Sequence, residues 1–228
     1  MSKQNNRQED PRFAPLNRVT ESLIAVLGIT QEFQEAAEVE RARADAEEER
    51  ANTMRELARV DPLTGLPNRR ALQETYARLQ ADRLRRVIDD PDHTEEPMRS
   101  CLLLIDVDDF KAINDGNKSH VEGDRILKKV AGVMLERTRP LDLVARLAGD
   151  EFAVLVHDVT PEEAVIIADD MRHVTEARGD VTLSVGVTPV DFNLGFEGNV
   201  EKADLALYDV KENGRNRVAL FDPAIHQV

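Results

Sequence analysis

Hydrophobic residues in the N-terminal part of the chain follow the spacing of α-helices. Leucine and valine recur every three or four residues between Leu16 and Val26, which predicts an amphipathic helix that is interrupted near Gly28. Thr30 can cap a second helix, which we expect to run to about Ala58.

The second of these predicted helices is rich in glutamate, alanine and arginine and offers little apolar surface. A helix this polar is barely stable alone, because helices gain most of their stability by packing an apolar face. A weak heptad repeat runs through its apolar positions, which are Phe33, Ala37, Ala44, Ala51, Met54 and Ala58. This repeat favours a parallel coiled coil between two copies over the alternative, a single helix lying on the globular domain.

From Asp61 onward the pattern alternates between helix and strand periods, as in a globular domain. The expected elements are, in order, a helix capped by Asn68 that runs to about Val87, a strand Cys101–Val107, a helix from Phe110, a helix Val121–Arg137, strands Leu141–Leu147 and Phe152–Val156, a helix Pro161–Ala177, a strand Val181–Val187, a helix Val200–Glu212 and a strand Arg217–Phe221. This order predicts an α+β fold, in which helices flank a mainly antiparallel central sheet. We divide the chain into residues 1–58, a disordered tail to about residue 14 followed by helices, and a globular domain of residues 59–228.

The composition, with 41% hydrophobic and 32% charged residues, fits a soluble globular protein. The net charge of −14 argues against binding of nucleic acid through its phosphate backbone, which needs a basic face. A nucleotide substrate is still compatible with this charge, because a bound divalent cation can supply local positive charge. The longest apolar runs, Leu23–Leu27 and Cys101–Ile105, are too short to span a bilayer, and the polar N-terminus lacks the apolar segment of a signal peptide. We therefore expect a cytoplasmic protein without a membrane span.

Acidic residues gather at the end of the first expected strand. Asp106 and Asp108 should point to the same side of it, and Asp109 can cap the helix that begins at Phe110. With Lys111 beside them, three acids at the end of a buried strand favour a site for a metal-bound phosphate over capping alone. An EF-hand loop is excluded, because its glycine and its final glutamate are missing at the required distances from Asp106.

A second acidic pair lies in the turn of the predicted hairpin, whose tip reads Ala148-Gly149-Asp150-Glu151. Two adjacent carboxylates repel each other in a tight turn, so the turn alone gives no reason for both of them. One interpretation is a solvated acidic turn. The other is a metal and phosphate site, in which Gly149 gives a ligand close access to the backbone.

Four separate segments of the chain resemble the GGDEF family, the diguanylate cyclases. They are Asp61–Arg70, similar to the turn that opens the family's domain, Asp106–Asp124, Arg146–Phe152, which resembles the signature hairpin, and Glu201–Arg217, similar to the closing motif. Ala148 stands where the family usually has its first glycine. The loop Gly116–Ser119 is one residue longer than the family's pattern, and Ser119 replaces a glycine, which affects the placement of His120.

The resemblance implies roles for a set of residues. They are Asp106, the carbonyl of Val107 and Asp150 as ligands of Mg²⁺ or Mn²⁺; Asp150 and Glu151 for proton transfer; Lys111, Lys211 and Arg215 for holding phosphates and offsetting developing charge; Asn114, His120 and Asp124 for the guanine nucleotide; and Arg139 with Asp142 for inhibitory product. A carboxylate at Asp124 would accept from the N–H groups of guanine and repel the N1 lone pair of adenine, which favours GTP over ATP. Product at Arg139 and Asp142 would lie on the order of 20 Å from the hairpin tip, so it would inhibit by holding domains apart.

The resemblance also implies a reaction and its partners. Two GTP molecules would be joined into cyclic di-GMP, with release of two pyrophosphates. The product is two-fold symmetric and each domain would hold one GTP, so the enzyme would act as a homodimer. The N-terminal helix would raise the effective concentration of the two domains and offer a site for a signalling partner. The alternatives are a catalytically silent receptor that binds cyclic di-GMP at Arg139 and Asp142 and, less favoured, a GTP-binding switch without turnover.

Overall fold

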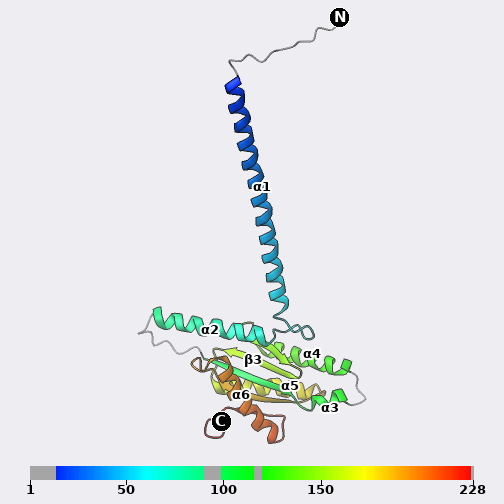
Figure 1. The fold of residues 1–228 in the computed structure, drawn as a ribbon. Coiled ribbons are helices and arrows are strands. Elements are labelled where there is room, and N and C mark those ends of the chain that lie inside the picture. The colour runs from blue at the N-terminus through cyan, green and yellow to red at the C-terminus, as the bar shows by residue number, and fades with distance from the viewer. Residues whose placement is uncertain (1–13, 90–98, 116–119, 227–228) are drawn as a thin grey trace. The chain divides into compact units, whose positions relative to one another are not determined.

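The computed structural model describes residues 14–89, 99–115 and 120–226, in two compact units, Met1–Leu57 and Ala58–Val228. The first unit contributes helix α1 (Ala14–Leu57), and the second contains a five-stranded sheet with helices around it (Figure 1). The tail predicted to be disordered lies outside the described residues, apart from its end. None of the described helices combines the length and the apolar character that a membrane span requires.

Helix α1 is continuous through Gly28, so the interruption predicted there and the cap predicted at Thr30 are both wrong. Glycine in a helix costs about 1 kcal/mol relative to alanine but keeps its backbone N–H, whereas proline would remove that donor. A long helix tolerates one such residue. The apolar positions between Leu16 and Val26 therefore share one helix and one heptad phase with those from Phe33 onward.

The sheet has the strand order β2-β3-β1-β4-β5. Its strands are β1 (Ser100–Val107), β2 (Leu143–Ala148), β3 (Glu151–His157), β4 (Leu183–Pro189) and β5 (Val218–Leu220). All neighbouring strands are antiparallel except β4 and β5, which confirms the mainly antiparallel sheet that the sequence predicts. The central strand, β1, is buried along residues 101–105, as its continuous apolar run indicates.

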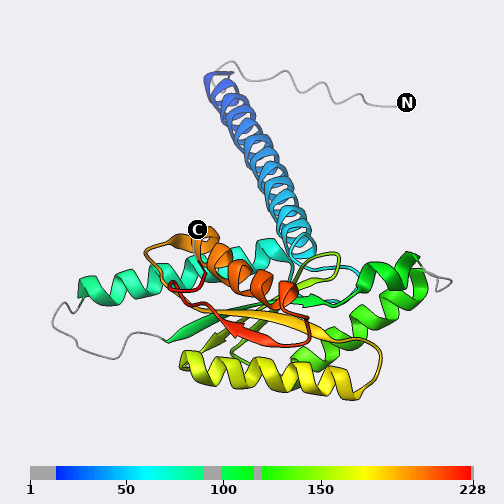
Figure 2. The same cartoon turned by 90° about the horizontal axis from the view of Figure 1, so that it is seen from below.

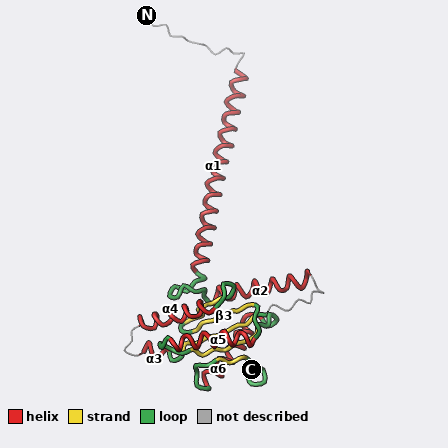
Figure 3. Tube along the Cα trace, turned by 180° about the vertical axis from the view of Figure 1, so that it is seen from behind, coloured by secondary structure: helices red, strands yellow, loops and turns green. Residues whose placement is uncertain are grey.

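Helices cover both faces of the sheet. They are α2 (Arg69–Asp89), α3 (Phe110–Asp115), α4 (His120–Arg137), α5 (Pro161–Ala177) and α6 (Gly195–Glu212). Alternate residues of β1 belong to different core clusters: Leu104 shares one with Leu207 of α6, and Ile105 shares another with Met134 of α4 and Met171 of α5. Figures 2 and 3 show α5 and α6 on opposite sides of the sheet. The sheet is thus the middle layer of three.

Side-chain caps begin two of these helices as the sequence predicts. Asn68 Oδ1 accepts a hydrogen bond from the Ala71 amide at 3.2 Å at the start of α2. At the start of α5, the Glu163 amide donates to Thr160 Oγ1 at 3.2 Å and the Thr160 amide donates to Glu163 Oε2 at 2.8 Å. This reciprocal pair is a capping box.

Helix α6 begins at Gly195 and not at Val200, where the sequence predicts its start. Gly195 and Gly198 lie in its first turn, and glycine weakens the helical signal of a sequence. The buried side chain of Asn199 compensates for this weakness. Its amide donates to the carbonyl oxygens of Gly195 at 2.6 Å and of Asp191 at 2.8 Å, which fastens the first turn to the preceding loop.

Gly186 of β4 lies where α6 packs directly on the backbone of the sheet. A Cβ added at Gly186 would lie 2.1 Å from the Ala203 carbonyl oxygen and 2.5 Å from the Leu207 amide nitrogen. Because these are backbone atoms, no side-chain rotation relieves the clash. We expect Gly186→Ala to lower the free energy of unfolding by about 2 to 3 kcal/mol in urea denaturation. Gly132→Ala in α4 is the control, because nothing lies within 4 Å of its added Cβ; an equal loss in both variants would contradict this packing.

Candidate active site

The end of β1 and the tip of the β2–β3 hairpin form one site. Asp106 of β1 lies opposite Glu151 of β3 in the sheet register, so the two side chains are cross-strand neighbours. The Val107 amide donates a hydrogen bond to the Asp150 carbonyl oxygen at 3.2 Å. The pairing of β1 with β3 thus brings together four predicted site residues from two distant segments of the chain.

Lys211 reaches these acids from α6, which packs on the sheet beside β1 and β4. Its Nζ lies 2.7 Å from Oδ2 of Asp106, and the two side chains are 32% and 14% exposed. The resemblance implies that Lys211 binds phosphate. In the structure its ammonium group forms an ion pair with Asp106, for which the resemblance implies metal binding.

Two carboxylates of this site, those of Asp106 and Glu151, are disfavoured in their charged form. Burial raises the pKa of Asp106 above its ordinary value, and repulsion by Asp150 and Asp108 adds to this, although Lys211 opposes it. Partial burial also raises the pKa of Glu151, together with the charges of Asp106 and Asp150 and against the attraction of Lys211. Asp106, Asp150 and Glu151 outnumber Lys211, the one lysine that the described residues place in an ion pair with this group, which favours binding of a cation.

The donor atoms at this site suit a hard divalent cation. They are carboxylate oxygens of Asp106 and Asp150 and the backbone carbonyl of Val107, and Mg²⁺ and Mn²⁺ prefer oxygen ligands. Within residues 14–89, 99–115 and 120–226, no three acidic, histidine or cysteine side chains already form a closed metal-binding group. An ion here would therefore need further oxygens from water or from a phosphate, as Mg²⁺ usually does.

Asp108 uses its carboxylate within the protein. The side chain is 6% exposed, and it accepts hydrogen bonds from Ser184 Oγ at 2.6 Å and Thr182 Oγ1 at 2.7 Å, both near the start of β4. The backbone N–H of Asn216 donates to Asp108 Oδ2 at 3.1 Å. The sequence grouped Asp108 with the acids that hold a metal-bound phosphate, but these three donors occupy its oxygens.

Asp109 does not cap α3, contrary to the prediction. Its φ of 54° is left-handed, whereas a capping residue at a helix start has an extended backbone. Its carbonyl oxygen accepts from the Ala112 amide at 2.9 Å, and its exposed carboxylate lies 3.9 Å from Nε of Arg215. The side chain of Asp109 thus faces a predicted phosphate-binding residue, Arg215.

Arg146 connects the hairpin tip to the turn that opens the domain. Its Nη1 donates to both carboxylate oxygens of Asp61, at 3.0 and 3.1 Å, and its Nε and Nη2 donate to the Gly149 carbonyl oxygen at 3.0 and 2.7 Å. Burial alone would raise the pKa of Asp61, but hydrogen bonds from Thr64 and Arg146 outweigh it and lower that pKa. One guanidinium thus fixes the backbone directly before Asp150.

Only one residue of the hairpin tip needs the freedom of glycine. Gly149 has a φ of 50°, whereas Ala148 ends β2 and is not among the described residues with positive φ. The side chain of Ala148 is exposed. Alanine at this position therefore introduces no left-handed strain into the turn.

The remaining predicted nucleotide-binding residues lie on α3, α4 and the segment after α6. Lys111 and Asp124 have exposed side chains, and within the described parts of the chain neither is hydrogen-bonded to Asp106, Asp150 or Glu151. Asn114 lies in α3 and His120 begins α4, but their side chains, like the loop of residues 116–119 with its extra residue, lie outside what the structure describes.

Arg139 and Asp142 form the turn between α4 and β2. The Arg139 amide donates to Asp142 Oδ2 at 2.8 Å, and the His157 amide at the end of β3 donates to Asp142 Oδ1 at 3.1 Å. Asp142 is thus engaged with the backbone, whereas the side chain of Arg139 is exposed. Burial lowers the pKa of His157, with Asp142 opposing it.

Three residues without a predicted role, Arg146, Asp61 and Asp204, lie at or beside the site in the structure. Asp204 adds to the repulsion that raises the pKa of Glu151. Its position two helical turns before Lys211 puts both on one face of α6, a pattern that the sequence already contains. The Arg146–Asp61 contact joins two segments that are distant in the sequence, and no local sequence pattern predicts it.

Comparisons with known proteins identify the family of the chain. The family model described as "Diguanylate cyclase, GGDEF domain" matches residues 58–217. The diguanylate cyclase DgcP of Pseudomonas aeruginosa is 38% identical over 172 residues, which are 72% of this chain and 24% of DgcP. The coiled coil and GGDEF domain of DgcB from Caulobacter crescentus, solved in complex with c-di-GMP, is 28% identical with a TM-score of 0.66 and covers 87% of this chain and 99% of that one.

A second solved structure resembles a still larger part of the chain. It is the diguanylate cyclase SiaD of Pseudomonas aeruginosa in complex with its activator SiaC, which is 27% identical with a TM-score of 0.60 and covers 92% of this chain and 84% of that one. The chain spans about a quarter of the length of DgcP. The matched residues 58–217 make up more than half of the chain and include every predicted site residue, so the chain belongs to the GGDEF family of diguanylate cyclase domains.

Proposed function

We propose that the protein is a diguanylate cyclase, which condenses two GTP into cyclic di-GMP and two pyrophosphates. The observation that carries this proposal is the convergence of Asp106, Glu151 and Lys211 from three separate motifs, with Lys211 Nζ 2.7 Å from Asp106. The homologous cyclase DgcP supports the same reaction. We also place the protein in the cytoplasm, where GTP is available.

In this reaction the 3′-oxygen of each GTP bonds to the α-phosphorus of the other, and each α-phosphorus loses its bond to the β-phosphate, so that two pyrophosphates leave. Asp150 and Glu151 take up the hydroxyl proton, a role for which the raised pKa of Glu151 is suited. Lys111, Lys211 and Arg215 hold the phosphates and offset the charge on the leaving pyrophosphate. Asp106, the Val107 carbonyl and Asp150 would hold Mg²⁺ or Mn²⁺, which would supply the remaining charge neutralisation.

The base is recognised by residues of α3 and α4 in this proposal. Asn114 and the exposed carboxylate of Asp124 contact the Watson–Crick edge of guanine, with His120 beside the nucleotide. A carboxylate accepts from the N1–H and N2–H donors of guanine, whereas adenine presents an acceptor at N1. The enzyme should therefore accept GTP and reject ATP.

The test of this function is product analysis by chromatography after incubation with GTP and Mg²⁺. Parallel reactions contain ATP in place of GTP, or a chelator in place of Mg²⁺. Cyclic di-GMP formed only with GTP and metal is the expected result. Absence of product at high protein concentration, together with tight binding of added cyclic di-GMP, would identify the protein as a silent receptor instead.

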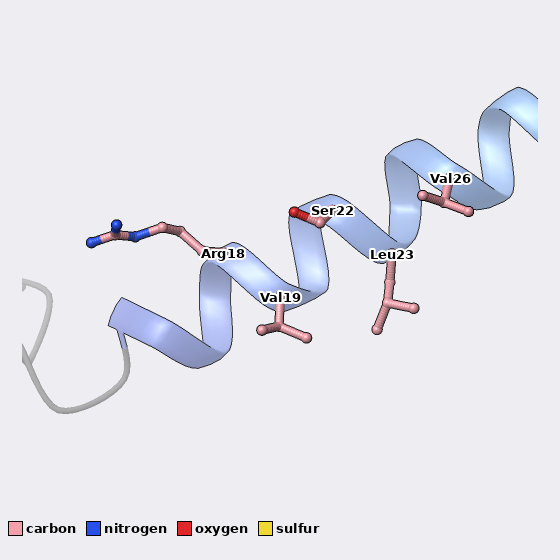
Figure 4. Close-up of a pocket in the computed structure, with 5 residues that line it drawn as sticks. All are labelled: Arg18, Val19, Ser22, Leu23 and Val26. Atoms are coloured by element: carbon pink, nitrogen blue, oxygen red, sulfur yellow. The ribbon is translucent and has the colours of Figure 1, made fainter.

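Two copies must bring their bound nucleotides together, and we propose that α1 pairs them as a parallel coiled coil. Val19, Leu23 and Val26 are more than half exposed on α1 and lie at heptad positions, and Figure 4 shows them along one side of the helix. The resemblance of the chain to a solved structure with a coiled coil supports this arrangement. SiaD, which this chain resembles, was solved in complex with an activator protein. We propose that a signalling partner of this chain binds at α1.

Deleting residues 1–55 should lower the specific activity at low protein concentration by about tenfold or more. The reason is that pairing through the helix raises the effective concentration of one catalytic domain near the other. The loss of this pairing lowers activity most when the protein is dilute. Specific activity is measured from micromolar to nanomolar protein for both forms. At high concentration the two should converge, and identical activity of both forms across the whole range would rule out pairing through α1.

We further propose that Arg139 and Asp142 bind the product as an inhibitor. The exposed guanidinium of Arg139 can pair with a phosphate of cyclic di-GMP, while Asp142 holds the turn. Arg139→Ala should therefore weaken product inhibition at least about tenfold while leaving the initial rate unchanged. Initial rates at increasing cyclic di-GMP measure this, and Arg70→Ala, an exposed arginine of α2, is the control.

A further inference from the structure

Residues with left-handed backbone gather beside the proposed phosphate-binding residues. Asp109, Arg215 and Asn216 have φ values of 54°, 59° and 47°, and Gly214 before them has 104°. L-residues other than glycine adopt this conformation at an energetic cost, so it persists only where the surrounding structure enforces it. Two such residues in succession, Arg215 and Asn216, therefore call for an explanation in the contacts around them.

The first contact that holds this segment comes from Asp108. Its buried carboxylate accepts the backbone N–H of Asn216 at 3.1 Å, while Ser184 and Thr182 donate to the same carboxylate and tie it to β4. A buried carboxyl group that accepts three hydrogen bonds cannot turn to solvent without losing all of them. The backbone of Asn216 is thus fixed to the sheet.

The second contact comes from Arg172 of α5. Its Nη1 donates to Asn216 Oδ1 at 3.0 Å, and the Arg172 side chain is only 10% exposed. Asp169 and Glu176 accept from the same guanidinium at 2.8 and 3.1 Å, so it is held in place. Asn216 Nδ2 in turn donates to Glu176 at 2.9 Å. Asn216 is therefore fixed through its side chain as well as through its backbone.

Arg215 lies between two fixed points. On one side its amide donates to the Val210 carbonyl oxygen of α6 at 3.0 Å, and on the other side it is followed by Asn216. Its own guanidinium is about half exposed, with Nε 3.9 Å from Asp109 Oδ1. The contacts of the guanidinium itself are weak. The direction in which the Arg215 side chain leaves the backbone is therefore set by the backbone contacts on either side of it.

We propose that Arg172 and Asp108 are positioning residues, which hold Gly214–Asn216 in its left-handed form so that Arg215 presents its guanidinium to the phosphates of GTP. This inference rests on the proposed function, in which Arg215 binds phosphate. The proposal places neither residue on the substrate, and Arg172, which lies on α5, then acts only through Asn216 and Arg215. Loss of Arg172 should then raise KM for GTP more than it lowers kcat.

A double-mutant cycle with Arg172→Met and Arg215→Met tests the proposal. We expect Arg172→Met to lower kcat/KM for GTP about tenfold in the wild-type background and to have almost no effect in the Arg215→Met background. A purely structural role would give the same loss in both backgrounds, and that result would overturn the proposal. Arg178→Met is the matched control, because this arginine at the end of α5 pairs with Glu136 instead and should leave kcat/KM unchanged.

If a thermal melt shows that Arg172→Met does not fold, a second variant takes its place. Asn216→Gly removes the acceptor of the Arg172 bond while glycine tolerates the positive φ, so it should reproduce the tenfold loss, again only when Arg215 is present. If the wild type forms no cyclic di-GMP, the proposed function fails. The same cycle is then measured on calorimetric binding of GTP, where coupling between Arg172 and Arg215 supports the inference and additivity overturns it.

Discussion

Asp106→Asn should lower kcat for cyclic di-GMP formation by at least about 10³-fold while making the metal-free protein more stable. The loss of activity follows from the role proposed for this carboxylate as a ligand of the divalent cation. The gain in stability follows from the site itself, because burial and the neighbouring acids raise the pKa of Asp106 despite its ion pair with Lys211. A charge that the folded protein disfavours is removed by the amide.

The pH dependence of stability provides the check on this reasoning. A carboxyl group with a raised pKa in the folded state stabilises the fold fully below its unfolded pKa, about 3.9 for aspartate, and this contribution is lost as the pH rises through the folded value. We measure thermal melts in a chelating buffer from pH 4 to pH 8. The stability of the variant relative to the wild type should increase as the pH rises. A variant less stable than the wild type at pH 7 would contradict this.

Two further measurements separate the electrostatic effect from a general effect of the substitution. Adding Mg²⁺ should stabilise the wild type and leave Asp106→Asn unchanged, because the ion binds the folded site only. Asp180→Asn is the matched control, for which we expect a stability change of the opposite sign. Hydrogen bonds from Lys129 and Arg125 lower the pKa of Asp180, so its contribution is present at neutral pH and lost as the pH falls; its amide should therefore destabilise the protein at pH 7.

The sequence predicts those parts of the fold that depend on local patterns. The run Cys101–Ile105 is apolar throughout because it belongs to the central strand with helices on both faces, and the Thr160–Glu163 box begins α5 at the predicted residue. Helix starts are missed where glycine occupies the first turn, as at Gly195, and a helix break is predicted where a long helix tolerates Gly28. Both errors arise from giving single glycines too much weight.

The candidate site is predictable as a set of residues but not as a set of contacts. Alternation along β1 places Asp106 at its end, yet nothing local indicates that Lys211 pairs with it. Asp108 shows the limit most clearly, because its sequence context is acidic and suggests a ligand, whereas its partners Ser184 and Thr182 lie in and directly before a distant strand, β4. Hydrogen bonds between distant segments decide which carboxylates are left to bind a cation.

Arg146→Met should lower the free energy of unfolding by about 3 kcal/mol, because it leaves the largely buried carboxylate of Asp61 without its cation. Activity should fall by about 10²-fold, since the same guanidinium holds the Gly149 carbonyl directly before Asp150. Urea denaturation and steady-state kinetics measure the two effects. Arg70→Met, which breaks an exposed pair with Glu74, is the control and should cost less than about 1 kcal/mol.

Two more variants distinguish the effect of the hydrogen bonds that Arg146 donates to both Asp61 and Gly149 from the effect of its charge alone. Arg146→Lys keeps the charge but cannot reach Asp61 and Gly149 together, so it should recover part of the stability and little of the activity. Asp61→Asn combined with Arg146→Met should be more stable than the sum of the single effects predicts, because no unpaired charge remains. If Arg146→Lys instead restored activity fully, its charge would suffice, and the bond to Gly149 would not be what positions Asp150.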